Sequence, residues 1–209
     1  MQTIVIFGAT GSLGTHIVKE ALSKGYTVKA FGRSIEKLKD LKNHNLSIVK
    51  GDVTNYFNVK NAIQNCDAVI CALGDGAKGK VRAIGTDNII KAMSELGVKR
   101  LICQTTLGMG ESWNNLNFFW KYIMFGLLLK KAFEDHKIQE KLVFESLLDW
   151  TIVRPSAFTD KSANGNFKID FGSTEKNLTL KIPRADIASF IIESLKMKNF
   201  IKKSVSISN

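Results

Sequence analysis

The sequence predicts an α/β fold in which a parallel sheet is covered by helices on both faces. Short apolar, β-branched runs such as residues 3–7, 27–31 and 46–50 alternate with stretches whose apolar residues have helical spacing. The runs are mostly continuous rather than alternating, as in strands that are buried on both faces. We therefore expect one doubly wound domain over residues 1–209, because no linker, repeat or low-complexity stretch divides the chain.

The first half of the chain predicts four strands and four helices in alternation. The strand TIVIF (3–7) ends at a glycine, and the helix from Ser12 to Ser23 stops at Gly25. Ser34 is placed as the N-cap of a helix over 35–42. The other elements expected in this half are strands at 27–31, 46–50 and 67–73, and helices at 56–65 and 80–96.

The second half predicts three further strands and a less regular region. A strand at 100–105 precedes a helical region over 117–147, and the next strand, 150–155, is stopped by Pro155. A last helix over 185–196 and a strand over 204–208 close the chain. Residues 158–182 contain glycines and many polar residues, so we expect a small lobe on the substrate side of the sheet.

A glycine-rich turn joins the first strand to the first helix. Gly8, Gly11 and Gly14 are spaced by two residues each, in the strand–turn–helix context of a Rossmann fold. Such a turn passes close to a pyrophosphate, and the helix points its N–H groups at the phosphates. A tight turn without a ligand is the alternative. The predicted pyrophosphate site consists of Gly8, Thr10, Gly11, Ser12, Leu13 and Gly14.

The end of the second strand predicts which nicotinamide cofactor is preferred. An acidic residue there would bind the ribose 2′-hydroxyl of NAD(H), but this chain has Arg33 and Ser34 instead. A guanidinium and a hydroxyl suit a 2′-phosphate, so NADP(H) is favoured over NAD(H). The alternative is that Arg33 is a solvated charge and Ser34 only a helix cap.

Two more turns are expected at the same edge of the sheet. Asp52 and Val53 follow the third strand, where an adenine would lie, and Ala72, Leu73 and Gly74 follow the fourth, beside a ribose. Each could be an ordinary turn by itself. Their shared position with the glycine turn favours a joint cofactor site.

Composition restricts the partners. The net charge of +11 comes mainly from scattered lysines, while arginine, the residue that reads bases, is scarce. We therefore expect no nucleic acid, although the positive field would attract an anionic cofactor. Cys66, Cys71 and Cys103 show no metal-site spacing, and no metal is expected. No leader peptide is visible and the apolar run 118–129 is too short to span a bilayer, so a cytoplasmic protein is expected.

These motifs resemble the atypical short-chain dehydrogenase/reductase superfamily. The match covers nearly the whole chain, through GATGSLG, FGRS, GDVTN, CALG, DHKIQEKLVFES and the closing IPRADIASFIIESL. It is most similar to the NAD(P)H-binding group that contains flavin reductase/biliverdin-IXβ reductase. The resemblance implies that Thr105 is a catalytic hydroxyl near the nicotinamide, bordered by Pro155, Ser156 and Ala157. Ser156 replaces a histidine of that group, which argues against tetrapyrrole reduction.

The chain lacks the tyrosine–lysine pair of main-line short-chain dehydrogenases. Tyr56 and Lys60 have the right spacing but follow the third strand, too early to face the nicotinamide. After the fifth strand the only tyrosine is Tyr122, and Gly126 stands where lysine would be needed. Without a positioned proton donor, the acceptor must itself spread the incoming charge, as flavins and quinones do.

The sequence thus favours an NADPH-dependent oxidoreductase that transfers a hydride to a conjugated acceptor such as a flavin or quinone. A non-catalytic NADP-binding sensor of the NmrA-like type is the alternative, and an epimerase is a weaker one. The aromatic segment 113–133 suits a substrate wall, but also core, an oligomer face or a helix on a membrane surface. His136 and Glu140, one helical turn apart, predict a surface hydrogen bond or ion pair.

Overall fold

The computed structural model describes residues 2–38 and 41–209. Its central sheet is mostly parallel, and only the last strand runs antiparallel to its neighbour. The order of strands across the sheet is β3 (Leu46–Lys50), β2 (Thr27–Gly32), β1 (Thr3–Phe7), β4 (Ala68–Cys71), β5 (Arg100–Gln104), β6 (Asp149–Pro155), β10 (Lys203–Ser208) and β8 (Lys168–Ile169).

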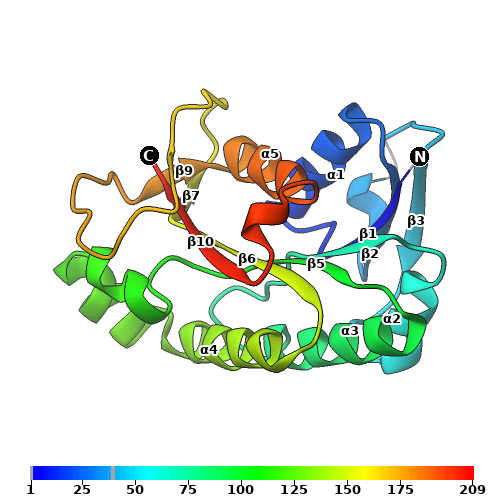
Figure 1. Cartoon of the computed structure of the whole chain (residues 1–209), viewed down its shortest axis with the longest axis horizontal. Helices are drawn as coiled ribbons and strands as arrows, with labels where there is room; N and C mark the ends of the chain where they lie inside the picture. Colours follow the sequence, from blue (N-terminus) through cyan, green and yellow to red (C-terminus); the bar gives the residue numbers. More distant parts are fainter. Residues whose placement is uncertain (1, 39–40) are drawn as a thin grey trace.

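Helices cover both faces of this sheet. Figure 1 shows α1 (Gly14–Ser23) and α5 (Arg184–Ser194) on one side, and α2 (Tyr56–Ile63), α3 (Arg82–Leu96) and α4 (Lys130–Glu145) on the other. Each layer encloses its own apolar core against the sheet, one around α1 and α5 and one around α2 and α3. The predicted doubly wound α/β fold is confirmed.

The strand register brings the predicted turns together. Phe7 on β1 lies opposite Phe31 on β2 and Cys71 on β4, and Cys71 lies opposite Cys103 on β5. The turns that follow these strands therefore meet at one edge. The chain also changes direction across the sheet between β1 and β4, and open α/β sheets bind ligands at such a switch point.

The helical region expected over 117–147 is not continuous. It consists of a π-helix, η3 (Phe119–Leu128), and α4, after a short 3₁₀ segment, η2 (Gly110–Asn115). In the expected helix 35–42, only a 3₁₀ turn, η1 (Ile35–Leu38), is formed, and residues 39–40 lie outside the described residues. No helix in the described ranges is both long and apolar enough to cross a membrane.

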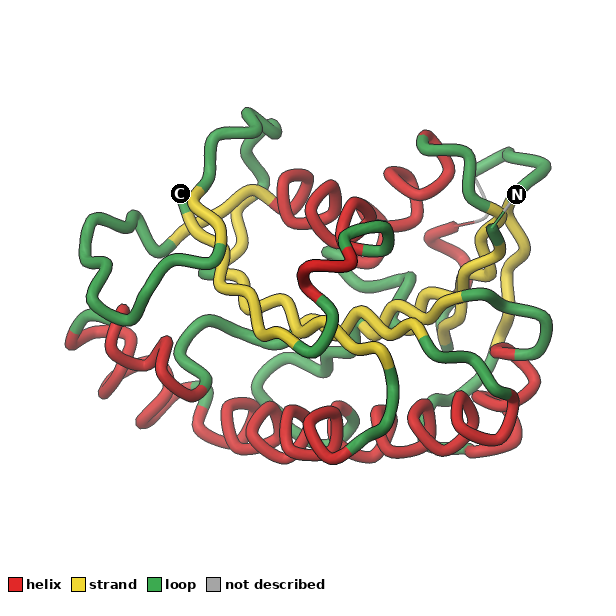
Figure 2. The backbone as a smooth tube through the Cα atoms, viewed as in Figure 1, coloured by secondary structure: helices red, strands yellow, loops and turns green. Residues whose placement is uncertain are grey.

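The irregular segment expected over 158–182 lies beside the end of the main sheet. Its ends form a second, two-stranded parallel sheet from β7 (Ala157–Thr159) and β9 (Lys181–Pro183). Figure 2 shows that the chain between these strands is mostly loop. A third apolar cluster lies here, where Phe125, Phe133 and Leu180 join residues from the loop after β5.

Candidate functional site

A cleft of about 480 Å³ lies at the carboxyl ends of β1 to β5. It gathers most of the residues that the sequence predicts for a cofactor. Those that line it are Gly8, Thr10, Gly11, Ser12, Leu13, Gly14, Arg33, Asp52, Val53, Ala72, Leu73, Gly74 and Thr105.

The three glycines of the first turn have different structural roles. A Cβ at Gly8 would lie 2.2 Å from the Ala72 carbonyl oxygen, and one at Gly14 would lie 2.0 Å from the Gly8 carbonyl oxygen. These two glycines therefore let the chain pack against itself. Gly11 is exposed, and a Cβ there would meet only the Gly8 oxygen, at 3.2 Å. Gly11 thus leaves open space on the side from which a ligand would approach.

The start of α1 leaves donors for an anion. Its N-cap residue, Leu13, makes no side-chain capping hydrogen bond. Within the described part of the chain, the N–H groups of Ser12 and Leu13 have no hydrogen-bond acceptor. Unpaired N–H groups at the positive end of a helix suit a phosphate. This turn therefore fits the pyrophosphate of a dinucleotide.

The outer end of the cleft carries Arg33 and Asp52. Arg33 follows β2, is exposed, and lines the cleft, so its guanidinium is accessible to a ligand there. Asp52 accepts hydrogen bonds from the backbone N–H and hydroxyl of Thr54, at 2.9 and 2.8 Å. These hydrogen bonds lower the pKa of Asp52, with a smaller contribution from Arg33, so its carboxylate stays ionised at neutral pH.

A buried ion pair that sequence reasoning missed lies behind Thr105, next to the inner end of the cleft but outside its lining. Arg154 on β6 donates from Nε and Nη2 to the two carboxylate oxygens of Glu140, at 3.0 and 2.7 Å. The hydroxyl of Thr105 donates to the same Glu140, at 2.7 Å. Burial lowers the pKa of Arg154, but the nearby Glu140 and Glu111 outweigh it and raise the pKa. The predicted surface role of Glu140 is therefore wrong.

His136 is also buried and lines the cleft, so its predicted surface role is wrong too. Its Nδ1 lies 2.9 Å from Gln139 Oε1, while Gln139 Nε2 donates to the hydroxyl of Thr86 at 3.0 Å. The Gln139 oxygen is thus an acceptor, which assigns the proton of His136 to Nδ1. Burial, with a further contribution from Arg82, lowers the pKa of His136 to about 3. The imidazole is neutral at physiological pH.

Arg82, a second missed residue, closes the cleft beside Gly74. Its Nη1 lies 2.7 Å from Asp75. Asp135 on α4 accepts from the N–H groups of Arg82 and Ala83, both at 3.0 Å, and so caps α3 from another helix. The N-cap residue of α3 makes no side-chain capping hydrogen bond. The capping carboxylate comes instead from a residue 52 positions away from Ala83, so no local sequence motif indicates it.

A second cavity, of about 300 Å³, adjoins the cleft. The two share Thr106 and Phe158 in their linings. Apart from the polar Ser156 and Arg184, the second lining is mostly apolar. Its other members are Leu107, Leu116, Trp120, Phe125, Leu129, Ala157 and Leu180.

The remaining predicted residues are spread around these cavities. Ser156 and Ala157 line the second cavity rather than the cleft, while Pro155 and Ser34 belong to neither lining. Tyr56 opens α2 and is absent from both linings, and its neighbour Lys60 forms an ion pair with Glu95 at 2.7 Å. The spacing of Tyr56 and Lys60 therefore does not mark a site.

Comparisons with known proteins agree with this geometry. The sequence model of a family described as NAD(P)H-binding matches residues 8–198. An uncharacterised chloroplastic protein of Arabidopsis thaliana is 31% identical over 180 residues, covering 79% of this chain and 62% of its own. The photosystem II assembly factor Ycf39 of Synechocystis is 25% identical over 213 residues, covering 96% and 60%. The chain thus spans less than two thirds of these relatives.

Solved structures match over nearly the full chain. An oxidoreductase from Lactococcus lactis has a TM-score of 0.84 at 24% identity, covering 100% of this chain and 91% of its own. The anaerobilin reductase ChuY of Escherichia coli has a TM-score of 0.81 at 22% identity, covering 99% and 96%. At these identities the likeness concerns the fold.

Proposed function

The chain belongs to the NAD(P)H-binding family, and from this premise we propose that it is an NADPH-dependent oxidoreductase. It transfers a hydride to a conjugated acceptor such as a flavin or a quinone. The observation that carries this proposal is the pairing of two adjoining cavities. A glycine-lined cleft suits a dinucleotide, and the mostly apolar cavity that shares Thr106 and Phe158 with it suits a flat ring.

The cofactor's expected contacts are supported by the geometry of the cleft. The open space at Gly11 and the free N–H groups of Ser12 and Leu13 receive the pyrophosphate. Arg33 receives the 2′-phosphate, which is the basis for preferring NADPH over NADH. When bound, the cofactor supplies a hydride from its nicotinamide ring.

The residues at the inner end hold ligands in place and donate no proton. The hydroxyl hydrogen of Thr105 is directed to Glu140, so its oxygen is left to accept a hydrogen bond from the nicotinamide carboxamide. His136 is neutral, and its one proton faces Gln139. An acceptor that delocalises the incoming charge needs no such donor, and solvent supplies its proton.

Two polar groups of the second cavity suit an oxygen of the acceptor. The Ser156 hydroxyl is buried and has no partner among the described residues. Arg184 lies on the same lining with its guanidinium 5.5 Å from the ring centre of Phe158; its Nη1 donates to Asp160 at 2.5 Å, while its buried Nε has no partner among the described residues. The Ser156 hydroxyl and the Arg184 Nε–H are thus two donors for the negative charge that develops on a flavin or quinone oxygen during hydride transfer.

A second candidate is a non-catalytic NADP-binding regulator. Two observations favour it: the described residues that line the cleft include no tyrosine–lysine pair, and one matching relative is named as an assembly factor. Both functions use the same cofactor cleft, so they differ only in whether an acceptor is reduced. The cytoplasmic location stays a prediction of the sequence.

NADPH oxidation, measured across a panel of flavins, quinones and biliverdin, tests the proposal. We expect turnover with at least one flavin or quinone and none in the Gly11→Val variant. If calorimetry detects NADPH binding but no acceptor in the panel is reduced, the regulator is the better description. If NADPH does not bind, both candidates are wrong.

A further inference from the structure

The segment around η3 exposes a row of large apolar side chains within residues 118–128. Each has at least 38% of its surface exposed, whereas such side chains are normally buried or scattered singly. We call this row the apolar ridge. It consists of Phe118, Phe119, Tyr122, Ile123, Leu127 and Leu128.

The opposite side of the same segment is already in use. Phe125 is buried and stacks on Phe133 of α4 with ring centres 4.5 Å apart, and Trp120 packs against Phe125 at 5.7 Å. Trp120, Phe125 and Leu129 also line the second cavity. The inner side of the segment is therefore anchored to α4. The ridge is exposed although the segment is firmly packed against the rest of the protein.

The charged residues within the ridge segment have one sign. Residues 112–133 contain Lys121, Lys130 and Lys131 and no aspartate or glutamate. None of the three lysines forms an ion pair with any described residue. The acidic residues that bound this stretch are engaged elsewhere: Glu111 pairs with Arg154, and Glu134 pairs with Lys137, at 2.7 and 2.8 Å.

We propose that the apolar ridge docks on the surface of an anionic lipid bilayer. Apolar and aromatic side chains that project beside unpaired lysines are the pattern of a helix lying in the membrane interface. Anionic headgroups would meet Lys121, Lys130 and Lys131 while the ridge enters the acyl boundary. The net charge of +11 adds long-range attraction to such a surface.

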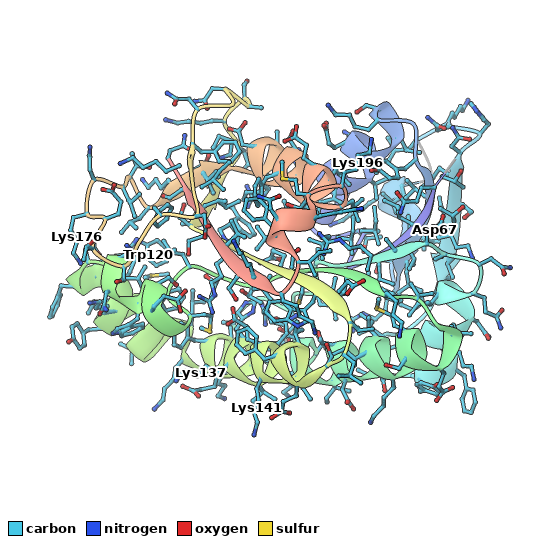
Figure 3. The ribbon with its side chains drawn as sticks, in the orientation of Figure 1. Asp67, Trp120, Lys137, Lys141, Lys176 and Lys196 are labelled. Atoms are coloured by element: carbon cyan, nitrogen blue, oxygen red, sulfur yellow. The ribbon has the colours of Figure 1, made fainter. Side chains whose placement is uncertain are left out.

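A second copy of the chain fits the ridge less well. A two-fold contact would place the same patch on both partners, and so bring the unpaired lysines of the two copies towards one another. No acidic side chain within residues 112–133 is available to neutralise them. The ridge also forms an outer end of the molecule, where Figure 3 places Trp120 and Lys176, away from Asp67 at the opposite end. A planar surface can reach it there.

Docking of the ridge would also bring the second cavity close to the membrane, because the same segment lines that cavity. Residues on the inner side of this segment, Trp120, Phe125 and Leu129, line the cavity, so docking would hold that cavity close to the lipid. If the proposed reductase function holds, its acceptor is then a lipophilic ring compound, such as a long-tailed quinone, taken from the bilayer. This last step rests on the proposed function, whereas the docking itself does not.

Vesicle co-sedimentation of the whole chain tests the docking. We expect binding to vesicles of phosphatidylcholine with about one third phosphatidylserine, weaker binding at high salt, and little binding to phosphatidylcholine alone. The double variant Phe118→Ser/Leu127→Ser should lose at least about tenfold in binding. The matched control is Phe57→Ser/Leu147→Ser, because these side chains, on α2 and in the loop between α4 and β6, are 72% and 90% exposed and lie outside the ridge. It should bind like wild type.

Charge reversal provides a second arm. Lys130→Glu/Lys131→Glu should lose at least about tenfold in binding to the anionic vesicles. Lys99→Glu/Lys203→Glu changes the net charge equally at sites outside the ridge segment and should lose much less. Equal losses in both pairs would reduce the effect to overall charge and overturn a specific docking face.

Further readouts separate this proposal from its alternatives. All these variants should keep NADPH affinity, since none of the substituted residues lines either cavity. Oxidation of NADPH by a long-tailed quinone in vesicles should fall in the ridge variant, while oxidation by a short water-soluble quinone should not. Sedimentation that reveals a dimer dissolved by the ridge substitutions, with no vesicle binding by wild type, would assign the ridge to a second copy instead.

Discussion

The two ends of the cofactor cleft are built in different ways. The outer end consists of backbone: a glycine turn, a helix start and the turns after β2, β3 and β4. The inner end depends on side chains from distant elements: Thr105 and His136 line it, and Glu140 of α4 holds Thr105 from behind while it pairs with Arg154 of β6. The first kind of site leaves a spacing in the sequence. The second depends on ion pairing and burial that exist only once the helix has packed on the sheet.

The largest expected effect separates two glycines of the outer end. Gly11→Val should abolish NADPH binding while the protein remains folded, because its side chain would fill the space meant for the pyrophosphate. Gly14→Ala should instead destabilise the fold by about 3 kcal/mol, because its Cβ would lie 2.0 Å from the Gly8 oxygen. Calorimetric titration and chemical denaturation of both variants measure this. An unfolded Gly11→Val protein would contradict the division of roles.

Substitutions next to the inner end of the cleft should lower the free energy of unfolding. Glu140→Gln leaves the buried guanidinium of Arg154 with the exposed Glu111 as its one charged partner among the described residues, which should cost about 3 kcal/mol of unfolding free energy. Glu145→Gln on the same helix removes an exposed pair to Lys141 and should cost less than about 0.5 kcal/mol. Urea denaturation compares them. Equal small losses would mean that Glu140 contributes little to holding α4.

Arg33 tests cofactor choice at the outer end. Arg33→Ala should weaken NADPH binding by about ten- to a hundredfold and leave NADH nearly unchanged, because only NADPH carries the 2′-phosphate. Lys37→Ala removes the same charge from a residue outside the cleft lining and should change neither. Dissociation constants at two ionic strengths check this, and the NADPH preference should fall with salt. Equal losses for both cofactors would remove Arg33 as the 2′-phosphate ligand.

His136 gives the inner end a dependence on pH. Its pKa is about 3 in the folded chain and 6.5 in the unfolded one, so the unfolded state binds more protons as the pH falls below 6.5. Stability should therefore drop by about 2 kcal/mol between pH 7 and pH 5. His136→Gln should flatten this part of the profile, whereas His44→Gln, outside both cavity linings, should not. A profile that His136→Gln leaves unchanged would contradict the buried neutral imidazole.

The smallest expected effect is at Tyr56. Because this residue lies outside both cavity linings, Tyr56→Phe should keep NADPH affinity and turnover within about twofold of wild type. Steady-state kinetics measure it. A loss of several orders of magnitude in kcat with normal folding would place the chemistry at α2 rather than at β5 and α4.

The sequence by itself determined the doubly wound fold, seven of the eight strands of the main sheet, and the turns that line the outer end of the cleft. The spacing of Gly8, Gly11 and Gly14 was readable because close backbone packing at Gly8 and Gly14, and open space at Gly11, each exclude a side chain, and the strand alternation set which turns share an edge. The position of Arg33 at the cleft was also readable, because it directly follows β2 and the end of that strand lies at the same edge.

Only the tertiary structure decided the inner end and the surface. In the sequence, His136 and Glu140 look like solvated helix residues, because their spacing does not indicate which elements pack against them. In the structure, packing of α4 against β6 and α3 buries both side chains. The break of region 117–147 into η3 and α4 was likewise hidden, because apolar residues in a row do not reveal which side has a partner. The third apolar cluster buries Phe125 and leaves Phe118 exposed, a choice made by long-range packing rather than by local sequence.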